Sequence, residues 1–361
     1  MGPSRSPLAR ELLAYAAALA RGGPPPPISP LETRDDRELE WILDGGLGPM
    51  LHRGLRDTGA TARARWREAL HAADLTAQVW QGNRIETTCE VIDTCRALGV
   101  PVTLLKGISV SEQHYPAGHL RPMGDVDVLV PAPARAAVEA ALVQRAYAPA
   151  RGLEPWTVSN HGIPLRDPER EVWVEVHEAL FENVDAEDVF GSAYLRARSM
   201  PSTFHGREVL RLPDELQLLY LAHAWAHDMA HYAVKVHPTC LPALFDAVFI
   251  VSRSPSSLDL GPLPYTSQTE LAIASLHTMM SYLAERGVAD VDRTSLAVLG
   301  SRQRVVGAVQ RRMMHAAIDR YLVGARPWDR PWPLPIPGRY SIRRQLRKRL
   351  FGPHLRAATR S

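Results

Sequence analysis

The sequence predicts an α+β fold, in which a small mixed β-sheet is flanked by α-helical regions on its N-terminal and C-terminal sides. Two observations predict it. Short apolar runs with polar ends alternate with helical segments in the middle of the chain. Apolar residues at mixed spacings of three and four dominate the chain on either side. We expect a helical region at 1–97, the sheet domain at 98–200, a helical domain at 201–325 and a Pro/Arg-rich arm at 326–361.

Composition limits the class of protein and its partners. The chain has 361 residues, of which 45% are hydrophobic, so it can bury a sizeable core. Its formal net charge of +3 gives no strong reason to expect nucleic acid as the main partner, although an RNA acceptor stays open. The three cysteines suggest neither a disulfide framework nor a zinc site. No apolar run reaches the ~18–20 residues that span a bilayer. We therefore expect a cytoplasmic protein with no membrane partner.

The first 97 residues predict helices and suggest no chemistry of their own. Apolar periodicity predicts helices at about 7–20, 35–43, 47–56 and 61–97. Four prolines at 24–27 form a stiff spacer after the first of them. We expect this region to pack against the following domain and to form part of its wall.

The chemistry is predicted between residues 102 and 130. The β-prone run Val102–Leu105 stops at Lys106–Gly107, and a helical segment follows. The next strand begins Gly124-Asp125-Val126-Asp127. Because side chains at i and i+2 point to the same face of a strand, the two aspartates present adjacent anionic oxygens. Such a pair is the arrangement that a hard divalent cation such as Mg²⁺ requires.

A third carboxylate is predicted on a later strand. A helix is expected at about 134–145, and strands are expected at 156–158 and 171–176. In the last strand the valines alternate with Trp173, Glu175 and His177. If the valines face the core helices, Glu175 lies on the same side as the aspartate pair. The alternative is that Glu175 is an exposed strand residue beside a surface histidine.

These motifs resemble the polymerase-β-like nucleotidyltransferase superfamily. More narrowly, they are similar to an uncharacterised nucleotidyltransferase family that has Lys-Gly where most of the superfamily has Gly-Ser. The resemblance is strong over about residues 100–180 and weaker to about residue 251. It rests on Leu104–Gly107, Tyr115, Arg121–Asp127 and Val174–His177. The central sheet would then be a polymerase-β-like nucleotidyltransferase domain.

The resemblance implies a transferase that depends on Mg²⁺ or Mn²⁺. It would move a nucleoside monophosphate from ATP or another NTP to a hydroxyl or phosphate of an unidentified acceptor, such as a small molecule or a peptide natural product. Asp125 and Asp127 are the expected metal ligands. Glu175 is expected as the third ligand or as the base that takes the acceptor proton.

Four residues are candidates for binding the nucleotide. Gly107 would let backbone N–H groups approach the triphosphate, at the N-terminus of the following helix. Lys106 would place its charge on the β- or γ-phosphate. Arg121 would bind a phosphate or a substrate carboxylate, with a structural ion pair as the equal alternative. His177 is assigned here because it follows Glu175 in the family's acidic strand motif.

Two alternatives from other classes remain open. A degenerate transferase fold that acts as a binding module would not bind NTP in a magnesium-dependent way. A zinc hydrolase would bind zinc through His223 and His227, whose spacing matches a zinc-binding helix. However, Ala224 stands where that zinc motif has its catalytic glutamate, so the histidine series with His231 is expected to line a helix contact or the cleft.

Overall fold

The structure is a computed structural model, and it describes residues 7–150, 162–181, 184, 187–231, 241–253, 260–264, 266–303 and 306–324. Within these ranges, the side chains of His227, Ala230, His231 and Ser267 are not described. The strand expected at 156–158 and the arm expected at 326–361 lie outside the described residues.

The described residues form one seven-stranded mixed sheet in the order β3-β4-β5-β2-β1-β7-β6, so the predicted α+β class is confirmed. Two pairings are parallel, β2 with β5 and β1 with β7, and the others are antiparallel. The strands are β1 Thr103–Leu104, β2 Asp125–Leu129, β3 Ala148–Pro149, β4 Leu165–Arg166, β5 Trp173–His177, β6 Met200–Phe204 and β7 Arg207–Arg211.

The hairpin of β6 and β7 extends the sheet past the boundary expected at residue 200. Its two-residue turn, His205-Gly206, has φ angles of 45° and 78°. Two consecutive positive φ angles are typical of a type I′ turn, whose twist matches that of the flanking strands. The hairpin joins the sheet through β7, where Leu210 pairs with Thr103 of β1.

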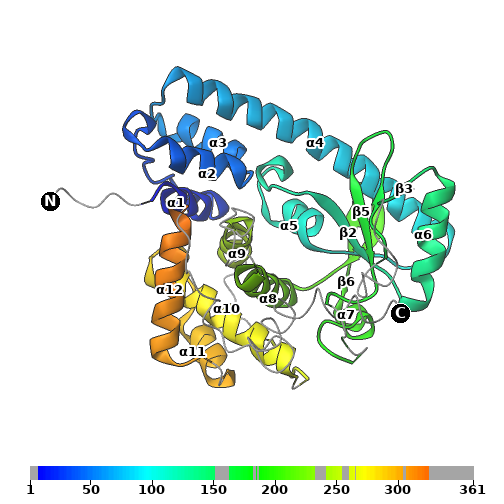
Figure 1. The fold of residues 1–361 in the computed structure, drawn as a ribbon. Helices are drawn as coiled ribbons and strands as arrows, with labels where there is room; N and C mark the ends of the chain where they lie inside the picture. Colours follow the sequence, from blue (N-terminus) through cyan, green and yellow to red (C-terminus); the bar gives the residue numbers. More distant parts are fainter. Residues whose placement is uncertain are drawn as a thin grey trace, which may run out of the picture.

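Twelve α-helices lie around this sheet in the described residues. Figure 1 shows α4 running along the sheet, and α8 and α9 lying between the sheet and α10 to α12. The helices are α1 Leu8–Ala20, α2 Asp36–Asp44, α3 Gly48–Thr58, α4 Ala64–Ala97, α5 Lys106–His114, α6 Arg135–Gln144, α7 Ser192–Arg198, α8 Asp214–His231, α9 Leu241–Arg253, α10 Ser267–Glu285, α11 Arg293–Arg302 and α12 Ala308–Leu322.

Two hydrophobic cores bury the two faces of the sheet. On one face the valines of β2 and β5 pack with α4 and α6, in a cluster that includes Val126, Val174, Ile92 and Val138. Each fully buried side chain of this size contributes about 1.5–3 kcal/mol. A slip of one residue would expose every one of these valines, so their burial fixes the register of both strands. The polar alternate residues consequently lie on the opposite face.

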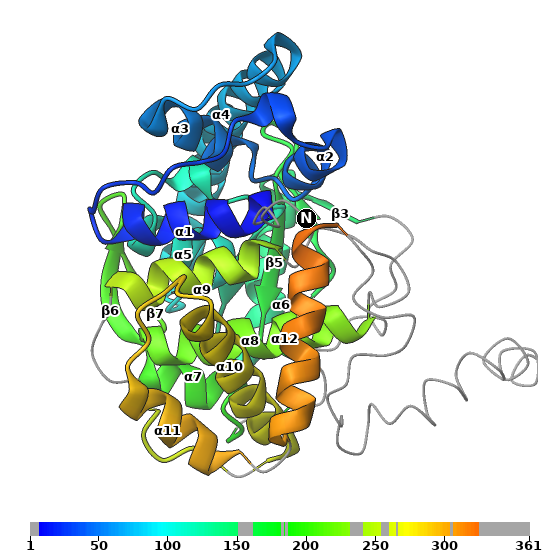
Figure 2. The same ribbon diagram turned by 90° about the vertical axis from the view of Figure 1, so that its left-hand side faces the viewer.

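Helix α1 connects the N-terminal region to the C-terminal helices. It packs against α9 and approaches α12, as Figure 2 shows from the side. At that contact Arg10 forms an ion pair with Asp319 of α12. The N-terminal region therefore packs not only against the sheet domain, as predicted, but also, through α1, against the C-terminal helices α9 and α12.

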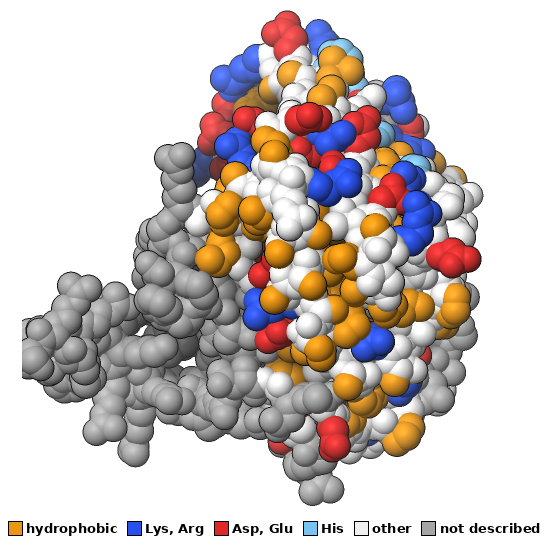
Figure 3. Space-filling view, turned by 90° about the vertical axis from the view of Figure 1, so that its right-hand side faces the viewer, with side chains coloured by type: hydrophobic (Ala, Val, Ile, Leu, Met, Phe, Trp, Pro, Cys, Tyr) orange, Lys and Arg blue, Asp and Glu red, His pale blue; other side chains and the backbone are white. Residues whose placement is uncertain are grey.

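Neither a membrane-spanning helix among the described residues nor, on the one face that Figure 3 draws, a uniform basic patch is present. No helix among the described residues is long and apolar enough to cross a bilayer. On the face drawn in Figure 3, acidic, basic and apolar side chains are intermixed over the described atoms. A nucleic-acid surface would instead gather Lys and Arg on one side.

Candidate active site

The acidic residues of β2 and β5 lie side by side at the same end of the sheet. The parallel register pairs Asp127 with Glu175 and Asp125 with Trp173. Neighbouring residues of paired strands project to the same face, which here is the face away from the valines. The alternation that the sequence predicted for β5 is therefore present, and Glu175 faces the same side as both aspartates.

Lys106 lies within reach of two of these carboxylates. Its Nζ is 2.7 Å from Oδ1 of Asp127 and 4.0 Å from Oε2 of Glu175. Lys106 is the first residue of α5, and its φ is 42°. A non-glycine residue in this left-handed region costs about 1–3 kcal/mol, a strain that is concentrated at functional sites. The sequence did not predict the pairing of Lys106 with Asp127.

His177 holds the same aspartate from the other side. Its side chain is 1% exposed, with Nε2 at 2.8 Å from Oδ1 of Asp127 and Nδ1 at 3.3 Å from the carbonyl oxygen of Ala179. Both partners are acceptors, so both ring nitrogens donate and the imidazole is protonated. Burial and Lys106 oppose this charge, but Asp127 and Glu175 outweigh them and raise the pKa of His177.

The two aspartates differ sharply in their electrostatic environment. Burial by itself would raise the pKa of Asp127, but Lys106 and His177 hold it well below its usual range. The negative charge of Asp127, together with burial, raises the pKa of Asp125 to about 7. Crowded anionic oxygens of this kind are stabilised by a cation of higher charge.

The donor set fits a divalent cation. Ligand atoms of Asp127, Glu175 and His177 all lie within 4.8 Å of one another, the one such group among the described residues. Asp125 is outside that group but is one pleat away on the same strand and face. Lys106 and His177 both contact Oδ1 of Asp127. Carboxylate oxygens are the ligands that Mg²⁺ or Mn²⁺ prefers, and the protonated His177 holds Asp127 in place instead of binding the cation.

Arg121 makes the structural ion pair that the sequence left open as an alternative. Its Nε and Nη2 donate to Oδ1 and Oδ2 of Asp246 on α9, at 3.0 and 2.7 Å. The hydroxyl of Tyr115 donates to the same carboxylate at 2.8 Å. The side chain of Asp246 is 0% exposed and that of Arg121 is 11% exposed. A role for Arg121 in phosphate binding stays a prediction.

Gly107 permits a close contact with the loop that precedes β2. A Cβ added to Gly107 would lie 2.5 Å from Nη1 of Arg121 and 2.7 Å from Cγ of Met123. The absence of a side chain thus lets residues 121–123 pack directly against the start of α5. This is a packing role, and the predicted approach of its backbone to a triphosphate stays a prediction.

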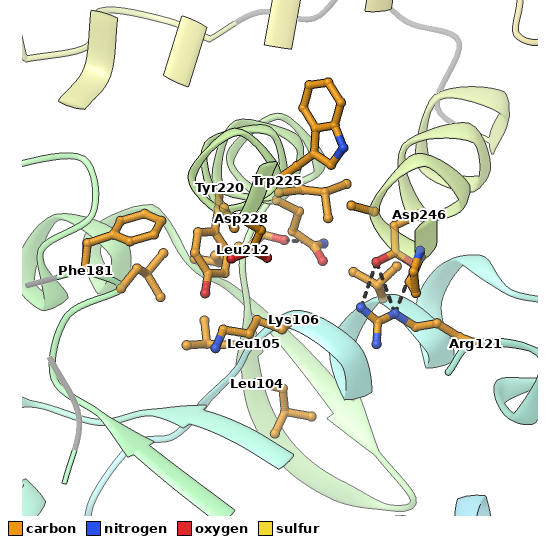
Figure 4. A pocket seen from close by; sticks show the side chains of 17 residues that line it. Leu104, Leu105, Lys106, Arg121, Phe181, Leu212, Tyr220, Trp225, Asp228 and Asp246 are labelled. Atoms are coloured by element: carbon orange, nitrogen blue, oxygen red, sulfur yellow. Dashed lines mark hydrogen bonds and ion pairs between the residues drawn. The ribbon is translucent and has the colours of Figure 1, made fainter. Parts of the chain in front are cut away.

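A cavity of about 330 Å³ opens beside Lys106, between the β1–α5 turn and helices α8 and α9. Figure 4 shows Lys106 below α8, with Arg121 and Asp246 on one side of the cavity and Phe181 on the other. Tyr220 of α8 lies across from Lys106, whose Nζ is 6.0 Å from the centre of its ring. The sequence predicted α8 as a helix but did not single out Tyr220 or Asp246 as residues of the site.

His223 of α8 packs in an aromatic cluster. Its side chain is buried, and its ring centre lies 4.1 Å from that of Phe181 and 5.0 Å from that of Phe190. Phe181 and Phe190 lie in the segment between β5 and α7 and not in a helix, so the predicted helix contact or cleft lining of the histidine series stays a prediction. The side chains of His227 and His231 lie outside the described part of the chain, and only the backbone places of these two residues on α8 are described.

A family match and two solved structures relate this chain to known proteins. The model of a family described as "Uncharacterised nucleotidyltransferase" matches residues 32–257, well over half of the chain. No curated protein matches.

The structural similarities are distant. The solution structure of the antibiotic-resistance factor ANT(2'')-Ia has 14% identity and a TM-score of 0.32, and the match covers 56% of this chain and 96% of that one. The crystal structure of an antigenic nucleotidyltransferase-like protein from Paracoccidioides brasiliensis has 13% identity and a TM-score of 0.36, with 59% and 96% covered. Both TM-scores are low, so the family match alone carries the relationship.

Proposed function

The chain belongs to the uncharacterised nucleotidyltransferase family and is a nucleotidyltransferase, and from that premise we propose the reaction and the residues that perform it. The donor is a nucleoside triphosphate, ATP by default. Its nucleoside monophosphate moves to an acceptor hydroxyl or phosphate in a reaction that depends on Mg²⁺ or Mn²⁺. We assign roles in this reaction to individual residues of the chain.

The observation that carries the proposal is the pairing of Asp127 with Glu175 on adjacent parallel strands, with Asp125 on the same face. These three carboxylates would hold the divalent cation. When bound there, the cation supplies positive charge for the phosphoryl oxygens and for the leaving pyrophosphate. The pKa of Asp125, raised to about 7 by Asp127 and by burial, supports a site that is completed by a cation.

In the transfer step, the acceptor oxygen forms a bond to the α-phosphorus, and the bond from that phosphorus to the bridging α–β oxygen breaks. Pyrophosphate leaves, and the acceptor's proton passes to a base. Asp127 is a poor base, because its pKa is held well below the usual range by Lys106 and His177 despite burial. Glu175, with 20% of its side chain exposed, is the more accessible carboxylate. We assign Glu175 as the base or the third metal ligand.

The surrounding residues position these groups. Lys106 exchanges its contact with Asp127 for a phosphate oxygen when the triphosphate binds, and Gly107 sits at the adjoining helix N-terminus. His177 orients the Asp127 carboxylate by holding one of its oxygens. We assign Arg121 to holding the 121–123 loop, because its guanidinium already binds both oxygens of Asp246.

No described residue favours the zinc hydrolase. His223 is packed between the rings of Phe181 and Phe190. The binding-module alternative differs from the proposed enzyme in one measurable property, the binding of triphosphate in a metal-dependent way.

Calorimetric titration with ATP tests the proposal. Wild type should bind ATP with Mg²⁺ and lose that binding in EDTA. The double variant Asp125→Asn/Asp127→Asn should bind at least about tenfold more weakly, because the cation loses two ionised ligands. Glu86→Gln on α4, whose side chain is 67% exposed, is the matched control and should bind like wild type. Absence of binding by wild type for every NTP would overturn the proposal.

A further inference from the structure

The cavity beside Lys106 leads directly to the proposed reaction centre. Lys106 lines the cavity and also contacts Asp127, so a molecule in the cavity ends next to the carboxylates. The cavity of about 330 Å³ has room for a small molecule or a single inserted side chain. Most of its wall is apolar, and its larger apolar side chains include Leu104, Leu105, Leu180, Phe181, Leu212 and Trp225.

The charged groups of the cavity wall do not suit an acceptor that carries a phosphate. Its two cations are Lys106 and Arg121, and each already contacts a carboxylate. Two further wall residues, Asp228 and Asp246, are themselves acidic. In the proposed reaction Lys106 binds the triphosphate and Arg121 stays with Asp246, so no cation of the described wall is left for a second phosphate. Moving an accepting phosphate from water into this apolar and acidic space would therefore cost free energy.

A further cation that suits the triphosphate, besides Lys106 at the cavity wall, lies outside the cavity. Arg166 of β4 pairs with Trp173, which pairs with Asp125, so the three side chains form one row across the same sheet face. Neighbouring strands are about 4.8 Å apart, which puts Arg166 roughly 10 Å from Asp125 across the sheet. Its side chain is 44% exposed, and its Nη2 forms an ion pair with Oε1 of Glu171 at 2.7 Å. A pair between exposed side chains contributes little stability, so a phosphate can replace Glu171 there. The triphosphate can therefore approach the carboxylates over the sheet face next to Arg166, which is not part of the cavity.

Gln217 of α8 has a buried hydrogen-bond acceptor, unpartnered among the described residues, in the wall of the cavity. It lines the cavity and is 6% exposed. Its Nε2 donates to Oε1 of Gln113 at 2.9 Å and to the carbonyl oxygen of Leu212 at 3.0 Å. Because a carbonyl can only accept, the amide nitrogen must face Leu212. Its Oε1 is buried and has no hydrogen-bond partner among the described residues.

An unpartnered buried acceptor calls for a donor on the ligand. A hydroxyl or an ammonium group is a donor, whereas an ionised phosphate presents acceptors only. We propose that this cavity is the acceptor site, and that the acceptor is an uncharged or cationic small molecule with an apolar body that is modified on a hydroxyl group. This inference rests on the proposed function and narrows it, because it excludes a phosphate as the accepting group.

Saturation-transfer NMR on the full chain tests the ligand class with three probes of similar shape. They are 4-ethylphenol, which is uncharged, tyramine, which is cationic, and phenyl phosphate, which is anionic. The first two should bind to wild type, and phenyl phosphate should not. Gln217→Met removes the acceptor at nearly constant size and should weaken both probes about threefold to tenfold.

A pair of variants tests the place of binding. Ala224→Trp fills the cavity from α8 and should abolish binding of both probes. Ala72→Trp adds the same side chain at an exposed position of α4 and should bind them like wild type. Calorimetry with Mg²⁺ and ATP is run on every variant, and ATP binding by Ala224→Trp should equal that of wild type and show that the variant is folded.

Each outcome separates this inference from the proposed function. Phenyl phosphate binding that is lost in Ala224→Trp would overturn the ligand class. Probe binding that is insensitive to both cavity variants would overturn the site. Loss of ATP binding in Ala224→Trp, with unchanged circular dichroism, would show that the nucleotide fills the cavity and would overturn the acceptor assignment. Failure of wild type to bind ATP, with probe binding intact, would refute the proposed function instead.

Discussion

Asp246 is the residue whose replacement tests most sharply how the site is held in place. Its carboxylate accepts two hydrogen bonds from Arg121 and one from Tyr115, and its side chain is 0% exposed. Asp246→Asn keeps the size but removes the charge, so the guanidinium of Arg121 loses its partner in a place that is 11% exposed. Removing one member of a buried ion pair costs about 3–5 kcal/mol.

We expect the lower end of that range, about 3 kcal/mol, because Asp246 and Arg121 also line the cavity and water there can solvate the exposed charge. Urea unfolding followed by circular dichroism measures it as a shift of the midpoint at constant slope. The triple variant Tyr115→Phe/Arg121→Met/Asp246→Leu replaces the whole hydrogen-bonded group by apolar side chains and should recover most of the loss. A loss below about 1 kcal/mol for Asp246→Asn would refute the reasoning, since an isolated surface pair costs that much.

Three smaller predictions concern single side chains. Lys106→Gly and Lys106→Ala both remove the amine and should weaken ATP binding alike, but the glycine variant should be more stable by about 1 kcal/mol, because φ is 42° at this position. Gly107→Ala should lower the free energy of unfolding by about 1–3 kcal/mol, because its Cβ would lie 2.5 Å from Arg121. Gly124→Ala, with no atom within 4 Å of the added Cβ, is its control, and equal losses would contradict the packing argument. Burial lowers the pKa of His277 to about 4, so stability present above the usual histidine pKa should be lost as the pH falls toward 4. Urea unfolding at a series of pH values measures this loss, and over the same pH interval the free energy of unfolding of His277→Asn should fall less than that of wild type.

The local part of the site was predictable because its signals are local. The aspartate pair lies on one strand, and side-chain alternation alone places both carboxylates on one face. The alternation of valines with Glu175 likewise predicted which side of β5 is polar, since the valines are buried against α4 and α6. What the sequence could not supply was the partner of each strand. The pairing of Asp127 with Glu175 depends on residues 48 positions apart that meet only in the folded sheet.

A local sequence pattern indicates the hairpin of β6 and β7, although the predicted sheet domain ended at residue 200. His205-Gly206 stands between two runs with β-compatible residues, and an x-Gly pair in that context indicates a two-residue turn. Its parallel partner β1 is only two residues long, so the pairing with Leu210 leaves little trace in the pattern.

Long-range contacts decided the remaining residues of the site. Arg121 and Asp246 are 125 positions apart, and nothing in either local sequence names the other as its partner. Lys106 was predicted to bind phosphate from its position beside Gly107, whereas its contact with Asp127 follows from the antiparallel pairing of β1 with β2. The cavity likewise forms from several segments, distant in the sequence, that only the tertiary structure brings together.

Binding of Mn²⁺, followed by electron paramagnetic resonance of the free ion, tests the central claim that these carboxylates hold a divalent cation for the nucleotide. Mn²⁺ replaces Mg²⁺ at oxygen-rich sites and reports its own binding directly. The account predicts that wild type binds Mn²⁺ more tightly when ATP is present, that Asp127→Asn loses this binding, and that Glu175→Gln weakens it about tenfold or more. Binding of Mn²⁺ and ATP that is unchanged in Asp127→Asn would contradict the account.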